Sequence, residues 1–403
     1  RVPMTTVFTL KRCYSRILLA GLVLGGSSDL TAKIKTGSFP TDGETNPVEI
    51  PDDIGRTVGN IEEGDETVDG TVESNDFVVA PLPSRNAAVG WTLAVPVMYM
   101  YRPEGVSQED STWITGAGGF YAENKSWGAG VFHRMSLDED RWRVTGAAFY
   151  GDLRYDYYGI GGITSNALPL RQKTSFYMVE GLYEVKESLY LGLKGVYADT
   201  LVGLGSINPD ANAPELPPML NQSIDIVSLT PRLRYDTRDN EFYPTDGILI
   251  DADAAFGVEA LGSVSDYELS KLALNFYHDL SDRGVLAGRV ATQYAAGDAP
   301  FFVFPAFGSG ADLRGYTTGT YRDRGLVAAQ LEYRHRLTQR LGVVAFGGAG
   351  SVSPNFLGWE ETLYSYGAGL RFVISQKNNL SIRFDYAWGR NDEQFYVGLG
   401  EAF

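Results

Sequence analysis

Apolar and polar residues alternate at nearly every position from Phe77 to Phe403, and this period-two pattern constrains the fold more than any other feature. Successive side chains of a strand point to opposite faces, so strict alternation predicts strands that are apolar on one face only. In residues 380–388, large apolar residues occupy every second position, and Ser381, Arg383 and Asp385 lie between them. No segment after residue 76 has the periodicity of a helix.

The lengths of these runs indicate strands that cross a membrane. Most runs contain roughly 10–16 residues, whereas typical soluble strands contain about 5–6 and a tilted membrane-spanning strand about 10. We expect sixteen strands, at residues 77–82, 89–102, 112–122, 126–136, 141–155, 172–186, 188–204, 223–237, 247–257, 264–280, 284–298, 325–338, 341–352, 362–375, 378–390 and 394–403.

The connections distinguish two interpretations of the alternation. A soluble sheet would turn its charged face to water, whereas a membrane barrel turns its apolar face to lipid and its polar face to the lumen. Short connections (137–140, 187, 281–283, 339–340, 376–377) alternate with long ones (156–171, 205–222, 299–324, 353–361), and the exceptions are 103–111, 123–125 and 238–246. This sidedness predicts an all-β fold, a 16-stranded antiparallel transmembrane β-barrel.

Composition excludes several classes of function. The 403 residues carry a net charge of −16, with 50 acidic and 34 basic residues, which argues against nucleic acid as a partner. The only cysteine is Cys13, and His133, His278 and His335 lie far apart in the sequence, so we expect no metal and no cofactor. No apolar run approaches the roughly 20 residues of a membrane-spanning helix.

The first 76 residues differ from the rest of the chain. Residues 1–32 contain basic residues followed by the apolar run 17–24 and small residues, which predicts an export signal peptide, although an uncleaved amphipathic segment also fits. Residues 33–76 are acidic and lack periodicity: residues 41–76 hold 12 Asp or Glu and a single basic residue, Arg56. We expect a disordered linker there; a small folded domain is the alternative.

One motif lies in the long connection between the eleventh and twelfth predicted strands. Residues 308–316 place an arginine among small and apolar neighbours, and their centre reads Asp312, Leu313, Arg314, Gly315 and Tyr316. A guanidinium folded into a barrel lumen needs a carboxylate partner, and glycines allow the backbone to approach the wall. The motif therefore suggests an inward-folded loop, although an ordinary glycine-containing turn has a similar composition.

Two further motifs accompany this loop in a fixed order. The turn at 236–247 has the spacing D-x-R-D-N-x-x-x-P-x-x-G, formed by Asp236, Arg238, Asp239, Asn240, Pro244 and Gly247. The run Gln-Leu-Glu-Tyr-Arg at 330–334 follows the loop. Together the three motifs resemble the surface-antigen barrels of the BamA/TamA-like superfamily over roughly residues 77–403. Members of that superfamily insert outer-membrane proteins or secrete polypeptides.

The resemblance implies roles for individual residues. Arg314 is expected inside the lumen, with Glu332 on the polar face of the next strand as its candidate partner. The family also carries an F-x-D-x-G pattern on the thirteenth strand, which here reads Phe346, Gly348 and Gly350, so a glycine replaces the aspartate. Three residues are candidates for the missing carboxylate, and the sequence does not choose among them: Asp312, Asp323 and Asp385.

A second departure concerns the region before the barrel. Family members that handle polypeptides usually carry periplasmic POTRA domains there, and residues 33–76 are too short and too acidic for one. The chain therefore resembles the branch that has a barrel and no POTRA domains. The 236–247 turn is expected to cap a hairpin by charge pairing rather than to bind a ligand.

The last predicted strand, 394–403, ends on Phe403 and resembles the insertion signal of Gram-negative outer-membrane proteins. We therefore expect this protein in the outer membrane of a Gram-negative bacterium. The expected partners are outer-membrane lipids and unfolded β-barrel clients, and the expected oligomeric state is a monomer.

The family mechanism implies a weak seam between the first and last strands that opens sideways. Pro81 and Pro83 remove hydrogen-bond donors from the first strand, and Gly398 and Gly400 loosen the last one. The first function hypothesis is thus an assembly factor that passes a protein or lipid through the seam. Simple fraying of a first strand beside a linker is the alternative interpretation of these prolines.

Two other classes of function are alternatives to an assembly factor. A passive outer-membrane pore would use the Arg314 loop as a constriction. A lipase would need a serine paired with a histidine on the lipid face, and His278 and His335 do fall on apolar faces near turns. No serine stands out beside them, so we expect no enzyme.

Overall fold

The computed structural model describes residues 35–36, 76–86, 89–104, 106, 111–161, 167–204, 222–308, 312–376 and 378–403. The expected signal peptide, residues 1–32, lies outside the described residues, as does the expected linker apart from residues 35, 36 and 76.

Strands make up nearly all of the described chain. They are β1 (Lys35–Thr36), β2 (Asp76–Val79), β3 (Leu82–Asn86), β4 (Gly90–Tyr101), β5 (Trp113–Ala122), β6 (Trp127–Leu137), β7 (Trp142–Tyr157), β8 (Leu168–Lys186), β9 (Leu189–Leu204), β10 (Gln222–Asp236), β11 (Gly247–Gly257), β12 (Tyr267–Ser281), β13 (Gly284–Gly297), β14 (Gly325–Arg336), β15 (Leu341–Ser353), β16 (Leu363–Ser375), β17 (Leu380–Gly389) and β18 (Asp392–Leu399). Two short 3-10 helices, η1 (Glu259–Leu261) and η2 (Phe301–Val303), lie in connections. Within the described ranges, no helix is long and apolar enough to cross a membrane.

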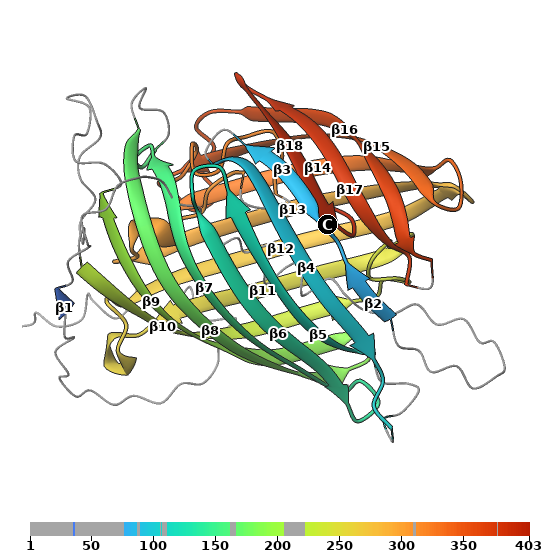
Figure 1. Cartoon of the computed structure of the whole chain (residues 1–403), viewed down its shortest axis with the longest axis horizontal. Helices are drawn as coiled ribbons and strands as arrows, with labels where there is room; N and C mark the ends of the chain where they lie inside the picture. The colour runs from blue at the N-terminus through green and yellow to red at the C-terminus, as the bar shows by residue number, and fades with distance from the viewer. Residues whose placement is uncertain are drawn as a thin grey trace, which may run out of the picture. The chain divides into compact units, whose positions relative to one another are not determined.

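These strands form one closed antiparallel sheet (Figure 1). Each strand from β4 to β18 pairs with the next, and β18 meets β3, which closes the ring. The two-residue β1 pairs with the first two residues of β10 and does not form part of the ring. Both β2 and β3 pair with β4, and together they form one interrupted strand. In the described chain this leaves sixteen strand positions around the barrel, which confirms the predicted fold class.

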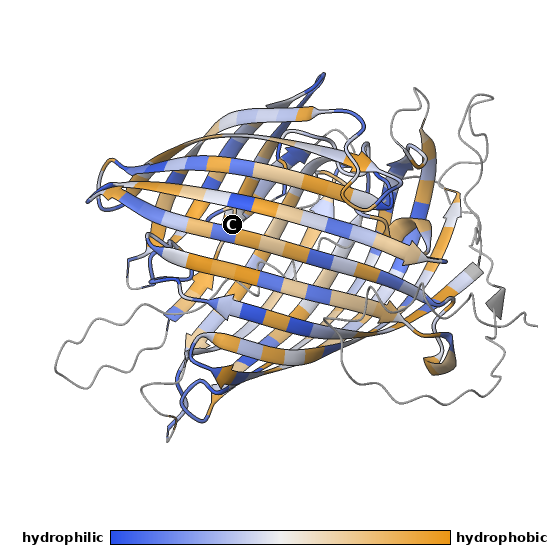
Figure 2. Cartoon of the chain, turned by 180° about the vertical axis from the view of Figure 1, so that it is seen from behind, coloured by the Kyte–Doolittle hydropathy of each residue, from blue (hydrophilic) through white to orange (hydrophobic). Residues whose placement is uncertain are grey.

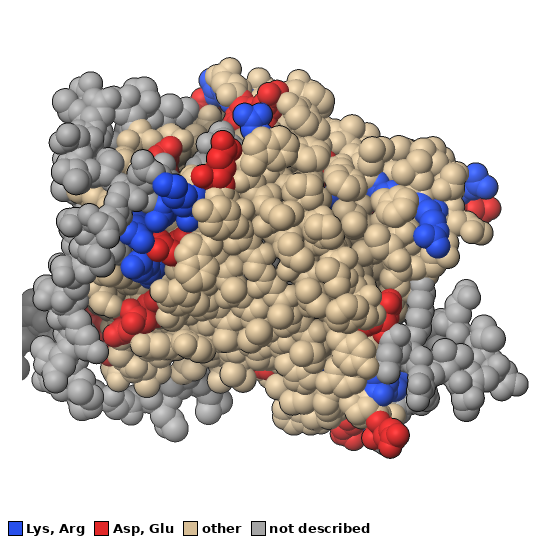
Figure 3. Space-filling view, viewed as in Figure 1, with Lys and Arg blue, Asp and Glu red and all other residues tan. Residues whose placement is uncertain are grey.

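The alternation of side chains matches the sequence prediction. On β14, Leu331 and Tyr333 are 54% and 43% exposed, whereas the intervening Glu332 and Arg334 are each 1% exposed. Bands of contrasting hydropathy cross the strands in Figure 2. The face seen in Figure 3 has a central belt without charged side chains, and Lys, Arg, Asp and Glu lie towards both ends. Such a belt with a polar interior is the arrangement of a membrane barrel.

The two ends of the barrel differ in their connections. Tight connections join β6 to β7, β8 to β9, β12 to β13, β14 to β15 and β16 to β17, and we call this the turn end. The opposite end, the loop end, carries the longer connections, including residues 298–324 between β13 and β14.

The predicted boundaries were wrong at both strands that close the ring. The first strand is not one run at 77–82 but two pieces, because β4 has Pro96 where Ala80 needs a backbone donor, and Pro81 has no N–H of its own. Ala80 still donates to the Pro96 carbonyl at 3.2 Å. The last strand ends at Leu399, because Gly400 adopts a φ of 69° and turns the chain inward.

If the exposed apolar face of the strands contacts lipid, a charged residue on that face should lower the stability of the barrel strongly. Leu331→Arg should destabilise the barrel in a bilayer by about 2–4 kcal/mol, because the guanidinium would lie against hydrocarbon. The measurement is urea-dependent unfolding in lipid vesicles.

Leu261→Arg is the matched control, because Leu261 is 52% exposed and lies in η1, outside the strands. It should change stability by less than about 0.5 kcal/mol. Equal effects at both positions would contradict the assignment of the outer face.

Candidate functional site

Arg314 lies in the connection between β13 and β14 and is 3% exposed. Its guanidinium donates to Glu332 Oε2 at 2.5 Å and to Asp385 Oδ2 at 2.6 Å. It also covers the Phe346 ring, with 3.5 Å from Cζ to the ring centroid. Charge-assisted hydrogen bonds of this kind are short and strong, and burial makes each partner depend on the others.

These carboxylates are shared with other arginines. Arg334 donates to Glu332 at 2.7 Å, and Arg371 donates to Asp385 and Glu401, each at 2.6 Å. The resulting group, which we call the lumen network, balances three guanidinium groups with three carboxylates; its members are Arg314, Arg334, Arg371, Glu332, Asp385 and Glu401. No side chain in it is more than 3% exposed.

The strand alternation explains how this network forms. Glu332 and Arg334 lie two apart on β14, so both point into the lumen, and Asp385 occupies an inward position on β17. Of the three candidates for the missing carboxylate, Asp385 is the one bonded to Arg314. Asp312 instead accepts two hydrogen bonds from Arg289.

Steric crowding explains why position 348 is a glycine. A Cβ there would lie 2.5 Å from the Ala329 carbonyl oxygen and 2.6 Å from Gln330 Cγ. It would also lie 3.1 Å from Leu313 Cδ1, in the loop motif. Gly350 has a similar place, since a Cβ there would lie 2.7 Å from the Phe307 ring. The inner face of β15 therefore has glycines, which carry no side chain, where the loop packs against it.

The residues that follow Arg314 hold the loop against β16 and β18. Gly315 has a φ of 99°, and its N–H donates to the Tyr396 hydroxyl at 2.8 Å. Tyr316 donates to the Tyr364 carbonyl at 2.6 Å. Burial raises the pKa of Tyr316 to about 12, which keeps this donor protonated. The Thr317 N–H donates to Asp392 at 2.5 Å.

Residues 400–403 also enter the lumen, which the sequence analysis missed. Phe403 is buried in one cluster with Tyr277 and Ala287 of β12 and β13. Its backbone oxygen accepts from Arg334 at 2.8 Å, and the Glu401 carbonyl accepts from Arg383 at 2.7 Å. The sequence feature that indicated this inward turn was Gly400, because the alternation of apolar and polar residues in the last strand ends there. A role of Phe403 as an insertion signal stays a prediction, since that signal would act before folding.

The junction between the first and last strands is the weakest in the ring. β18 and β3 share one register pair in the described residues, Phe395 with Arg85. By contrast, β9 and β10 are paired continuously from Gln222–Val202 to Tyr235–Leu189. We call the β18–β3 junction the seam.

At the turn end, apolar overlap takes the place of a backbone ladder across the seam. Leu380 occupies an outward position on β17, yet it is fully buried. It belongs to an apolar cluster with Val78 of β2, Ala80 between the two pieces of the first strand, Leu82 of β3 and Leu399 of β18. The inner face of β2 and β3 therefore covers the outer face of β17 and β18, and Asp76 accepts from Ser375 at 2.9 Å.

The 236–247 turn is held by its own motif residues. Arg238 pairs with Asp236 at 2.7 Å, and Asn240 Oδ1 accepts from the N–H groups of Phe242 and Tyr243. Asp239 accepts from the N–H of Thr245 at 2.8 Å. Pro244 lies inside this turn, and Gly247 closes it with a φ of 104°, where a Cβ would lie 2.3 Å from the Thr237 carbonyl.

The histidines and acidic side chains give no clear metal site in the described chain. Asp246, His278 and Asp279 bring three ligand atoms within 4.8 Å of one another, but all three side chains are exposed. His335 contacts Tyr333 at 3.3 Å. We assign no ion to these groups, because exposed acidic clusters are common on protein surfaces.

Comparison with known proteins identifies the family. Residues 123–403 match the family model described as the Omp85 superfamily domain, which is more than half of the 403-residue chain. The chain belongs to the Omp85 superfamily. This confirms the resemblance indicated by the three motifs, and Omp85 barrels are outer-membrane proteins. No curated protein matched the sequence.

Several solved structures share the barrel fold. BamA from Haemophilus ducreyi lacking POTRA domains 1-3 has 14% sequence identity and a TM-score of 0.53, with 86% of this chain and 77% of that chain covered. CdiB from Acinetobacter baumannii has 12% identity and a TM-score of 0.57, with 82% and 60% covered. CdiB from Escherichia coli has 12% identity and a TM-score of 0.53, with 83% and 68% covered. At such identities the likeness establishes the fold alone.

The close approach of β14 to Gly348 predicts that this Omp85 barrel does not tolerate a side chain at position 348. Gly348→Ala should destabilise the protein by about 1–3 kcal/mol, because the added methyl group would overlap the β14 backbone. Unfolding in urea with vesicles measures the effect.

Gly347→Ala provides a matched control on the same strand. Its Cβ would meet only the Ser365 carbonyl, at 3.5 Å, an ordinary contact distance. A loss of stability at Gly347 as large as that at Gly348 would mean that strand flexibility, not the close approach of β14, requires these glycines.

Proposed function

We propose that this Omp85 barrel is an outer-membrane assembly factor that opens at the seam and passes a hydrophobic client segment between its lumen and the bilayer. The client is a polypeptide with unpaired β-strands, and lipid is the second candidate cargo. In this proposal the turn end faces the periplasm of a Gram-negative bacterium, as short turns do in membrane barrels. The protein acts as a binding and insertion factor, without enzymatic chemistry.

The single register pair at the seam is the observation that carries this proposal. A closed barrel normally has no free strand edge. Here β18 and the β2–β3 strand pair only through Phe395 and Arg85 in the described chain, so most backbone donors and acceptors along this junction lack a ladder. An exposed strand of a client can pair with such an edge by β-augmentation.

The apolar overlap at the turn end supports the same mechanism. Packing between Leu380, Leu399 and the inner face of β2 is non-directional, whereas a hydrogen-bonded ladder fixes one register. Two surfaces held by such packing can separate without breaking a full ladder. In the described chain, every other junction between neighbouring strands has several register pairs, so opening is confined to the seam.

Two segments inside the lumen weigh against the alternative of a passive pore. Arg314 and its flanking residues bridge from β14 to β17 and β18 through buried hydrogen bonds. Residues 400–403 add a second segment across the interior. A diffusion channel requires an open polar path, and both segments narrow the space for such a path.

A disulfide across the seam tests the proposal. Arg85→Cys with Phe395→Cys, in a Cys13→Ser background, places two thiols at the one paired position of the seam. The oxidised protein should lose its acceleration of β-barrel folding into vesicles, and a reductant should restore it. The measurement is the folding rate of an urea-unfolded eight-stranded outer-membrane protein.

A second disulfide serves as the control. Val290 and Ala329 are register partners on β13 and β14, away from the seam. Their cysteine variants should cross-link without loss of client folding. Full activity of the oxidised seam variant would contradict the proposed function.

A further inference from the structure

The turn at residues 237–246 lies far from the seam in the sheet yet contacts it through the lumen. It joins β10 to β11, the eighth and ninth of the sixteen strand positions counted from β2 and β3. The seam lies between the first and sixteenth positions, so the turn starts on the opposite wall. We call these residues the mouth turn, because they cross the turn end of the barrel.

Phe242 carries the contact with the seam. Its side chain is 3% exposed and belongs to the apolar cluster that joins the seam strands. The other buried members come from β2 to β5 and from the ends of β17 and β18; they are Val78, Ala80, Leu82, Met98, Met100, Ile114, Leu380 and Leu399. One aromatic ring from the far wall therefore shares an apolar cluster with residues from both sides of the junction.

Other residues of the mouth turn hold it to the wall on both sides. Glu241 lies 3.6 Å from Arg134 on β6, the fourth strand position, and both side chains are buried. Burial raises the pKa of Glu241, and the charge of Arg134 opposes this shift. On the other side, Arg336 of β14 covers the Tyr243 ring at 4.0 Å.

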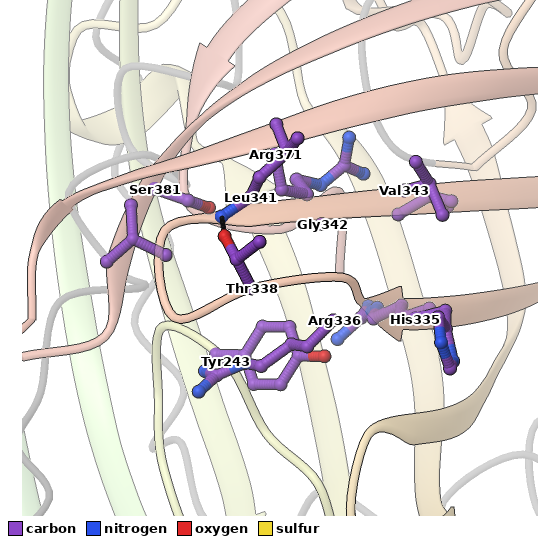
Figure 4. A pocket seen from close by; sticks show the side chains of 12 residues that line it. Tyr243, His335, Arg336, Thr338, Leu341, Gly342, Val343, Arg371 and Ser381 are labelled. Atoms are coloured by element: carbon purple, nitrogen blue, oxygen red, sulfur yellow. Dashed lines mark hydrogen bonds between the residues drawn. The ribbon is translucent and has the colours of Figure 1, made fainter.

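Figure 4 shows the contact on the β14 side. Tyr243 lies next to Arg336, at a small pocket that is also lined by Thr338 and Ser381. The mouth turn thus has one anchor on β6, one on β14 and a hydrophobic contact at the seam. Three contacts spread around the rim give the turn a defined position across the mouth.

We propose that the mouth turn is a brace that keeps the seam shut until it is displaced. This proposal concerns the regulation of the seam and rests on the proposed function. With Phe242 in place, separating β18 from β2 and β3 exposes the apolar cluster on both sides of the ring. With Phe242 withdrawn, the same separation breaks fewer contacts, so the closed state loses stability relative to the open state.

Spin labels on either side of the seam measure its opening without a client. Leu93 on β4 and Tyr386 on β17 are outward-facing, flank the seam and leave its own residues unchanged. Both are replaced by labelled cysteines in a Cys13→Ser background in vesicles. Phe242→Ala should raise the long-distance population by about tenfold, the effect of a change of about 1.4 kcal/mol.

Phe242→Leu is the matched control, because leucine keeps much of the apolar contact and should leave the population near that of the parent protein. An unchanged population in folded Phe242→Ala, with native migration on unheated gels, would overturn the brace. If Phe242→Ala does not fold, a reversible tether replaces it. Cysteines at Glu241 and Arg134, joined by a short cleavable thiol cross-linker, should lower the open population, and cleavage should restore it.

A tether without effect on the open population would also overturn the proposal. These outcomes are separate from a failure of the proposed function. If the barrel with the seam disulfide still inserts clients, the assembly-factor function fails, while the distance measurement still decides whether the mouth turn controls the seam.

Discussion

The burial of six charged side chains in the lumen is the constraint on which the rest of the structure depends. Removing one partner from a buried ion pair leaves an uncompensated charge at a cost of about 3–5 kcal/mol. Arg314 from the loop, Glu401 from the inward-turned last residues and four charges from β14, β16 and β17 must therefore be in place together. The loop and residues 400–403 are held in the lumen by the same requirement.

This constraint separates a rigid part of the ring from a weak one. The network joins β14, β16 and β17, which are also fully paired with their neighbours. The seam begins one strand further on, where β18 meets β3 through one register pair. A gate in the barrel wall requires a rigid group of strands next to a weakly paired junction. In that arrangement the strands separate at the seam and not elsewhere in the wall.

The fold could be predicted from the sequence because the alternation has a period of two, and one face of each strand must meet lipid. The Arg314–Glu332 contact followed from the strand register and the resemblance. The choice of Asp385 did not, because it depends on which inward carboxylate the loop reaches across space. The inward turn at Gly400 and the role of Glu401 were missed, because this turn is set by one positive φ and by partners on β16 and β17. The reach of Phe242 across the mouth likewise has no local sequence signal.

Ion conductance in planar bilayers, with the wild-type protein beside Arg314→Ala, tests the central claim that the lumen network holds the loop in the barrel. The account predicts a small, intermittent wild-type current that grows when Arg314 is removed, because the loop loses its bonds to Glu332 and Asp385. A large, steady current that is indifferent to Arg314 would contradict it and leave a simple pore.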